Sequence, residues 1–149
     1  MNKATETASP AHSPSTRFFD ALALRKDPHA CAALLRNQLD VSFYHDLALL
    51  VGMPIKELFS MLGVSPAVQR RWKKTQKLTI SESDYAFHYA LLIQDALGLF
   101  EGNRESTVEW LNRPTIALGN VTPASLLSTF VGIKLVESLI WRIENGVLG

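Results

Sequence analysis

At three points after residue 16, a residue whose side chain caps helices is followed directly by proline. These pairs are Asp27-Pro28, Ser65-Pro66 and Thr122-Pro123. Proline suits the first helical position, where the N–H would have no partner, but it disrupts helix interiors and central strands. Each pair therefore predicts the start of a helix, and together they divide the chain into short helical segments.

Further capping residues and glycines predict the other helix boundaries in the first half of the chain. Ser42 is expected to cap a helix that ends at Gly52. Pro54 is expected to begin a helix that ends at Gly63. The helix that starts at Ser65-Pro66 is then expected to continue to about residue 76.

The second half begins with a long predicted helix over residues 82–100. Thr79 or Ser81 is expected to cap this helix, because an acidic residue follows each of them after three positions, as in a capping box. Further helices are predicted over residues 104–112, from Thr122-Pro123 onward, and over about 132–144.

No stretch alternates apolar and polar residues with a period of two, so we expect an all-α fold. The long predicted helix carries a stripe of apolar side chains that is wide enough to need covering on more than one side. We expect residues 79–100 to link two helical parts and to help form a homodimer. The stripe consists of Tyr85, Phe87, Tyr89, Leu91, Leu92, Ile93, Ala96, Leu97 and Phe100.

The charges are distributed unevenly, although the net charge is only +1. Residues 1–77 contain eleven Lys and Arg residues against six Asp and Glu, whereas residues 78–149 contain four against eight. This asymmetry suggests that the two halves have different partners, and that the partner of the first half is anionic.

The cysteine count and the lack of long apolar runs indicate the cellular compartment in which the protein acts. Cys31 is the only cysteine, so it has no partner for an intramolecular disulfide. We find no signal-peptide pattern and no apolar run of 18 residues. We therefore expect a cytoplasmic protein that does not bind membranes. Residues 1–16 are small and polar, with two prolines, and we expect them to be disordered.

Two short predicted helices joined by Leu62-Gly63-Val64-Ser65 have the length and the glycine of a helix-turn-helix. The second carries cationic and amide side chains that suit phosphates and base edges. Val68 and Trp72, four residues apart, are expected to face inward. A solvated basic face without a ligand is the alternative. The candidate DNA-binding residues are Ser65, Gln69, Arg70, Arg71, Lys73 and Lys74.

The residue types that support catalysis or metal binding do not form a recognised pattern. The four histidines and Cys31 lack the spacing of metal ligands. Asp84 and His88 are four residues apart, which predicts a helical pair rather than an acid–base dyad. We therefore expect neither enzymatic activity nor a metal ion or other cofactor.

The last forty residues contain many small, aromatic and turn residues at fixed offsets. They are Trp110-Leu111-Asn112, Pro114, Ala117-Leu118-Gly119, Thr122-Pro123, Leu126-Leu127, Thr129, Gly132, Val136, Arg142-Ile143-Glu144 and Gly146-Val147. In order and spacing these residues resemble the toxin-binding domain of the Xre/MbcA/ParS antitoxins. The resemblance covers about residues 58–149 and is most specific from residue 109 onward. Asn120 departs from the family pattern, which usually has glycine there, but asparagine also tolerates left-handed backbone.

The resemblance implies an antitoxin with an Xre-like helix-turn-helix in residues 17–78 and a small helical toxin-binding domain in residues 101–149. Its partner in this family is commonly a RES-domain toxin that consumes NAD. The complex of toxin and antitoxin typically represses its own operon, which implies binding to operator DNA. Because helix-turn-helix operators commonly have two-fold symmetry, we expect an antitoxin homodimer within this complex. The toxin carries the chemistry, and the antitoxin is not an enzyme.

The last predicted helix and the tail supply the candidate toxin-binding residues. Trp110 is expected to anchor the core, whereas Trp141 fits either the core or an interface. The tail is expected to enter the active site of the toxin with its free carboxylate. The candidates are Lys134, Glu137, Trp141, Arg142, Val147, Leu148 and Gly149.

Two other functions fit the same sequence. One is a dimeric helix-turn-helix transcriptional regulator without a toxin partner, whose C-terminal part only dimerises. The other is a helical scaffold without affinity for DNA. A gene for a RES-like protein beside this one would argue against the first, and salt-dependent binding to DNA against the second.

Overall fold

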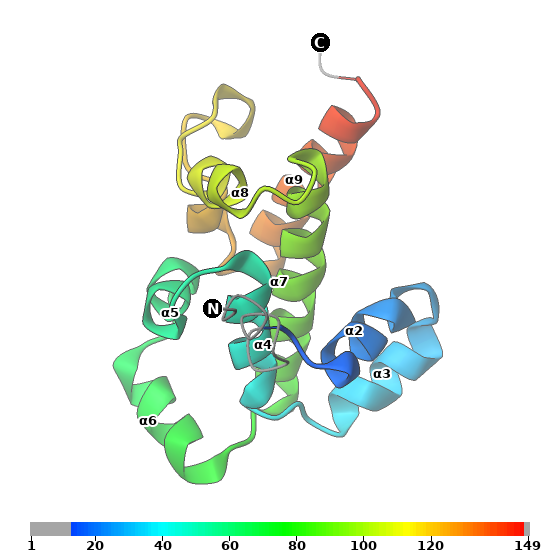
Figure 1. The fold of residues 1–149 in the computed structure, drawn as a ribbon, viewed down its shortest axis with the longest axis vertical. Coiled ribbons are helices and arrows are strands. Elements are labelled where there is room, and N and C mark those ends of the chain that lie inside the picture. Colours follow the sequence, from blue (N-terminus) through cyan, green and yellow to red (C-terminus); the bar gives the residue numbers. More distant parts are fainter. Residues whose placement is uncertain (1–12, 148–149) are drawn as a thin grey trace, which may run out of the picture.

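The computed structural model describes residues 13–147, and α-helices and short 3-10 turns make up this part of the chain (Figure 1). Within these residues, the only β-structure is two isolated bridges, Asp40 with Lys77 and Thr115 with Val121. The predicted all-α class is confirmed. The helices are α2 (Thr16–Ala23), α3 (Pro28–Arg36), α4 (Ser42–Val51), α5 (Ile55–Leu62), α6 (Pro66–Thr75), α7 (Ile80–Leu99), α8 (Arg104–Leu111) and α9 (Phe130–Glu144).

Most of the predicted helix boundaries are confirmed. The side chains of Asp27 and Ser65 each accept a hydrogen bond from the backbone N–H three residues later, at 3.1 and 3.2 Å. Gly52 and Gly63 end α4 and α5 in the left-handed conformation, at φ values of 76° and 75°. Thr79 rather than Ser81 caps α7, in a complete capping box.

Two predicted helix starts are wrong. Ser42 is the first residue of α4 rather than its cap, and the preceding Val41 makes no side-chain cap. Thr122 caps only one 3-10 turn, η4 (Ala124–Leu126), by accepting a hydrogen bond from Ser125 at 3.1 Å. The chain then extends through Thr129, which caps α9 two residues earlier than predicted. Packing of η4 against the start of α9 therefore overrides the helix signal of Thr122-Pro123.

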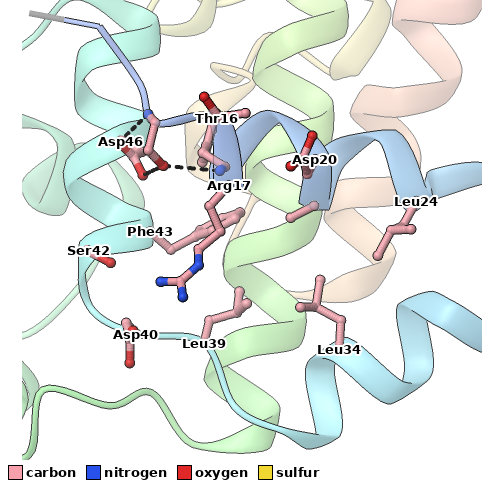
Figure 2. Close-up of a pocket in the computed structure, with 13 residues that line it drawn as sticks. Thr16, Arg17, Asp20, Leu24, Leu34, Leu39, Asp40, Ser42, Phe43 and Asp46 are labelled. Atoms are coloured by element: carbon pink, nitrogen blue, oxygen red, sulfur yellow. Dashed lines mark hydrogen bonds between the residues drawn. The ribbon is translucent and has the colours of Figure 1, made fainter. Parts of the chain in front are cut away.

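The N-terminal segment predicted to be disordered is described only in its last four residues. Residues 1–12 lie outside the described residues. Ser15 caps α2, and both its backbone N–H and its hydroxyl donate to the Asp46 carboxylate on α4, each at 2.9 Å (Figure 2). These bonds anchor the start of α2 on α4.

Helix α7 runs through the middle of the molecule, and the other helices cover it on several sides (Figure 1). Ten of its 20 residues are buried, and they occupy most of its circumference, apart from a polar stripe of Asp84, His88 and Asp95. Helices α2, α3, α4, α8 and α9 all pack against it. Most of the apolar stripe is thus covered within the chain, which leaves little of it for the dimer contact that we inferred from the sequence.

The C-terminal part packs on the N-terminal helices as well as on α7. Helix α8 contacts α4, and η4 contacts α5. Arg104 donates from Nε to the carbonyl of Leu50 at 3.2 Å, and the Tyr89 hydroxyl donates to the carbonyl of Leu127 at 2.8 Å. The buried residues of both parts form one hydrophobic cluster. The two parts therefore share a core.

At Gly132, α9 packs closely against the preceding turn. A Cβ at this position would lie 1.7 Å from the carbonyl oxygen of Leu126, which is backbone and has little freedom to move. We expect Gly132→Ala to lower the free energy of unfolding by about 1–3 kcal/mol, measured by urea denaturation.

Gly98→Ala in α7 is the matched control, because a Cβ there would meet no atom within 4 Å. Replacing this helical glycine should leave the free energy of unfolding unchanged or raise it by about 0.5–1 kcal/mol. Equal stability of the two variants would contradict the proposed close packing at Gly132.

Candidate functional site

Val68 and Trp72 form the inner side of α6, as the sequence predicted. Trp72 is buried and Val68 is half-buried. The Trp72 ring stacks on Tyr44 of α4 and lies beside Phe59 of α5, with ring centroids 5.1 and 5.8 Å apart. The opposite side of α6 therefore faces solvent.

Glu82, in the first turn of α7, connects α6 to α7. Its carboxylate accepts hydrogen bonds from the Trp72 indole at 2.9 Å, from the backbone N–H of Thr79 at 2.9 Å, and from the Arg71 guanidinium. Burial opposes the ionisation of Glu82, but these hydrogen bonds outweigh that effect and lower its pKa to about 2. Glu82 is therefore a charged clamp between the two helices.

Contacts within the protein separate the six candidate DNA-binding residues into two groups. Ser65 caps α6, Arg71 is bound to Glu82, and Gln69 donates from its amide to the carbonyl of Val64 at 3.0 Å. The other three are exposed and make no side-chain hydrogen bond or ion pair within residues 13–147. We call these three, Arg70, Lys73 and Lys74, the basic face.

The sequence analysis missed Glu82 as a residue of this site. Its signal was the capping box with Thr79, which predicts the bonds to the helix start. The contacts to Trp72 and Arg71 depend on how α6 packs against α7, and the capping pattern carries no information about that packing.

Helix α9 has one buried side and one exposed apolar side. Gly132, Ile133, Val136, Leu139 and Ile140 are buried. The opposite side presents four large apolar residues to solvent, with Val131, Leu135 and Trp141 exposed by 72%, 49% and 58%. We call this side, made by Phe130, Val131, Leu135 and Trp141, the α9 face.

The candidate toxin-binding residues divide between this face and its edges. Lys134 and Trp141 are exposed on the α9 face, which excludes the core as the site of Trp141. Arg142 is half-buried, and its Nε has no hydrogen-bond partner within the described residues. Glu137 is half-buried and points toward His88 of α7, at 4.0 Å. Val147 is exposed, and the last two candidates, Leu148 and Gly149, lie outside the described residues.

An aromatic contact and the turn before α9 stabilise the region around the α9 face. Phe130 stacks on Tyr85 of α7 with ring centroids 4.2 Å apart, which fixes the first turn of α9. The 3-10 turn η3 (Ile116–Leu118) packs against α9, and its Ile116 is 86% exposed. Gly119 and Asn120 follow in left-handed conformations, at φ values of 80° and 65°. Asparagine is thus tolerated where glycine was expected.

A large cavity lies elsewhere, between α2, α3 and α4 (Figure 2). It has a volume of about 810 Å³ and a mostly apolar floor that includes Phe18, Leu34 and Phe43. Of the carboxylates on its rim, Asp46 is bound by Ser15, and Asp40 pairs with Lys77 at 3.2 Å. Arg17 and Asp20 also line the cavity, and their side chains make no hydrogen bond or ion pair within residues 13–147.

The described residues contain neither a cluster of metal ligands nor a membrane-spanning helix. Across residues 13–147, no group of three or more His, Cys, Asp or Glu side chains is arranged to hold a metal ion. Asp84 and His88 form the predicted helical pair, at 3.5 Å. Within the same residues, no helix combines the length and apolar character needed to cross a bilayer.

Comparison with known proteins adds to this geometry. A family model described as the antitoxin Xre/MbcA/ParS C-terminal toxin-binding domain matches residues 96–146, which include α8 and α9. A protein of Yersinia enterocolitica named Antitoxin Xre is 30% identical over 114 residues, which are 76% of this chain and 77% of the relative.

Two further proteins with the same name match a shorter region. The protein of Photorhabdus laumondii is 37% identical over 79 residues, which are 53% of each chain. The protein of Pseudomonas putida is 30% identical over 79 residues, which are 53% of this chain and 49% of the relative. The matched region spans about half the length of these two relatives.

The Glu82 clamp makes stability depend on pH. The folded-state pKa of Glu82 is lowered to about 2, below the ordinary value of 4.5, so ionised Glu82 stabilises the fold above pH 4.5. This stabilisation is lost as the pH falls from about 4.5 to about 2. Glu82→Gln retains the capping box but not the charge. We expect this variant to unfold at a lower temperature than the wild type at pH 7, and the difference to disappear near pH 2.

Glu105→Gln is the control, because Glu105 is an exposed glutamate in the first turn of α8 without an ion pair in the described chain. Thermal unfolding of the three proteins between pH 2 and pH 7 measures the effect. A difference between wild type and Glu82→Gln that stays constant over this range would contradict the clamp.

Proposed function

Because this chain belongs to the Xre/MbcA/ParS antitoxin family, we propose that it binds and neutralises a cognate toxin through its C-terminal part, residues 101–149. The observation that carries this proposal is the α9 face. It exposes three aliphatic or aromatic side chains and part of Phe130 within the region that the toxin-binding family model matches. Several large apolar side chains exposed on one side of a helix suit an interface with a partner, and tryptophan is enriched among the residues that dominate binding energy.

We propose a RES-domain toxin that consumes NAD as the partner. The support is the family resemblance, in which this class of toxin is common. The toxin would carry the chemistry, and this chain would act in the cytoplasm by binding rather than as an enzyme.

The candidate toxin-binding residues would have different roles in the interface. Trp141 would be the central apolar anchor, and Lys134 and Arg142 would flank it with positive charge. Glu137 lies at the edge toward α7 and would take a peripheral part. The tail residues Val147, Leu148 and Gly149 would continue from the end of α9 into the toxin. Full neutralisation by a chain that ends at Gly146 would remove the tail from the proposal.

We also propose that the basic face binds operator DNA, so that the antitoxin represses its own operon. The support is the exposed, unpaired state of Arg70, Lys73 and Lys74 on a helix whose other side is anchored by Trp72. Such cations neutralise phosphates and release counterions, which makes binding depend on salt.

A homodimer within a larger complex with the toxin completes the proposal, because helix-turn-helix proteins commonly bind operators with two-fold symmetry. Because most apolar residues of α7 are buried, another surface would form most of the contact. Sedimentation that detects only monomers would remove the homodimer. The alternative function, a dimeric regulator without a toxin, would use the α9 face for dimerisation instead.

The test of toxin binding is a double substitution on the α9 face, Leu135→Ser with Trp141→Ala. Co-expression with the toxin, a growth assay and a pull-down measure neutralisation and binding. We expect affinity for the toxin to fall at least about 30-fold, the loss typical of a dominant interface residue, and growth to be inhibited.

The matched control is Ile80→Ser, which removes an apolar side chain of similar exposure, 51%, from the start of α7. This variant should bind and neutralise like the wild type. Neutralisation by the double variant would contradict the assignment of the α9 face. A double variant that loses a homodimer, in a chain that binds no toxin, would favour the regulator.

The DNA proposal predicts a change in salt dependence. In Lys73→Ala with Lys74→Ala, we expect weaker binding to the promoter of its own gene and a log–log salt slope that is smaller by about two, one for each phosphate contact. Lys26→Ala, at an exposed lysine in the turn after α2, is the control. Titrations at several salt concentrations measure the slope, and an unchanged slope would argue for a merely solvated basic face.

A further inference from the structure

The first half of α6 offers few side-chain hydrogen-bond donors to DNA. Pro66 and Ala67 have none, and the Ser65 oxygen accepts the bond of the helix cap, which leaves its short O–H as a donor. These small residues form a low surface at the start of the helix. Recognition helices contact base edges mainly with their N-terminal residues, so the first long side chain after this surface matters most.

Three long polar side chains follow, and two of them, Gln69 and Arg71, are already bound within the protein. Gln69 donates its amide to the carbonyl of Val64 at 3.0 Å, whereas a paired contact with adenine needs both the amide N–H and the amide oxygen. Arg71 is held by the Glu82 carboxylate, which also binds Trp72 and the start of α7. Moving Arg71 to DNA would break this clamp.

Arg70 is the remaining side chain. It is exposed and has neither an ion pair nor a side-chain hydrogen bond within residues 13–147. It lies on the solvent side of α6, one turn after Pro66 and one turn before Lys73 and Lys74. The lysines lie about 4–6 Å further along the helix axis, which suits contact with the phosphate backbone.

We propose that Arg70 is the residue that determines sequence specificity, and that its guanidinium donates to O6 and N7 of one guanine in the major groove of each operator half-site. This inference rests on the proposed DNA binding by the basic face. Arginine provides the planar pair of donors that guanine requires, and lysine does not. A single such contact in each half-site predicts one strongly preferred guanine, with other positions read weakly.

The test uses full-length protein and a pool of DNA duplexes with a randomised central segment. After selection and sequencing, we expect the wild type to enrich one guanine per half-site. Arg70→Lys should keep the positive charge and most of the affinity for random DNA. Its preference for guanine over the other bases should fall on the order of tenfold, because the paired contact is lost.

Arg71→Lys is the matched control on the same helix, and it should leave the guanine preference unchanged. Thermal unfolding should show the wild-type midpoint for Arg70→Lys, since Arg70 is exposed. Loss of the preference in Arg71→Lys but not in Arg70→Lys would overturn the proposal, as would selection without an enriched guanine. Both of these outcomes leave DNA binding standing. A wild type that retains no duplex even at low salt would overturn the DNA binding together with this inference.

Discussion

Helix α7 is apolar over most of its circumference, and a helix of this kind is stable in water only if other elements cover its apolar sides. That requirement places the remaining helices: α2, α3 and α4 cover part of its surface, and α8 and α9 cover the rest (Figure 1). Because no single helix is wide enough for the task, segments from both ends of the chain meet on α7. The shared core follows from this one constraint.

The beginning of α7 also decides what α6 is free to do. Glu82 stabilises the start of α7 through the capping box, and the same carboxylate holds Trp72 and Arg71 of α6. The contact fixes the orientation of α6, but it withdraws one cation from the surface that would meet DNA. Stability and DNA contact thus compete for Arg71, and the hydrogen bonds that lower the Glu82 pKa to about 2 favour stability.

Local signals predicted the helices well wherever the boundary chemistry is local. Asp27-Pro28, Ser65-Pro66 and the glycines at 52 and 63 are confirmed because a cap or a left-handed residue acts within one turn. Thr122-Pro123 failed because packing of η4 on α9 ended its turn early. The division of the basic residues could not be predicted from the sequence either, since Arg70 and Arg71 are neighbours. Arg71 faces Glu82 of α7, whereas Arg70 faces solvent.

Because the two parts share a core, truncation of the chain cannot separate toxin binding from DNA binding. Removing residues 101–149 would expose the side of α7 that Leu111, Leu127 and Val136 help to bury, so the truncated chain would lose stability along with the α9 face. A failed interaction after such a deletion would say little about the toxin. The basic face and the end of α9 lie near opposite ends of α7 (Figure 1). Surface substitutions therefore separate the two proposed functions, whereas division of the chain does not.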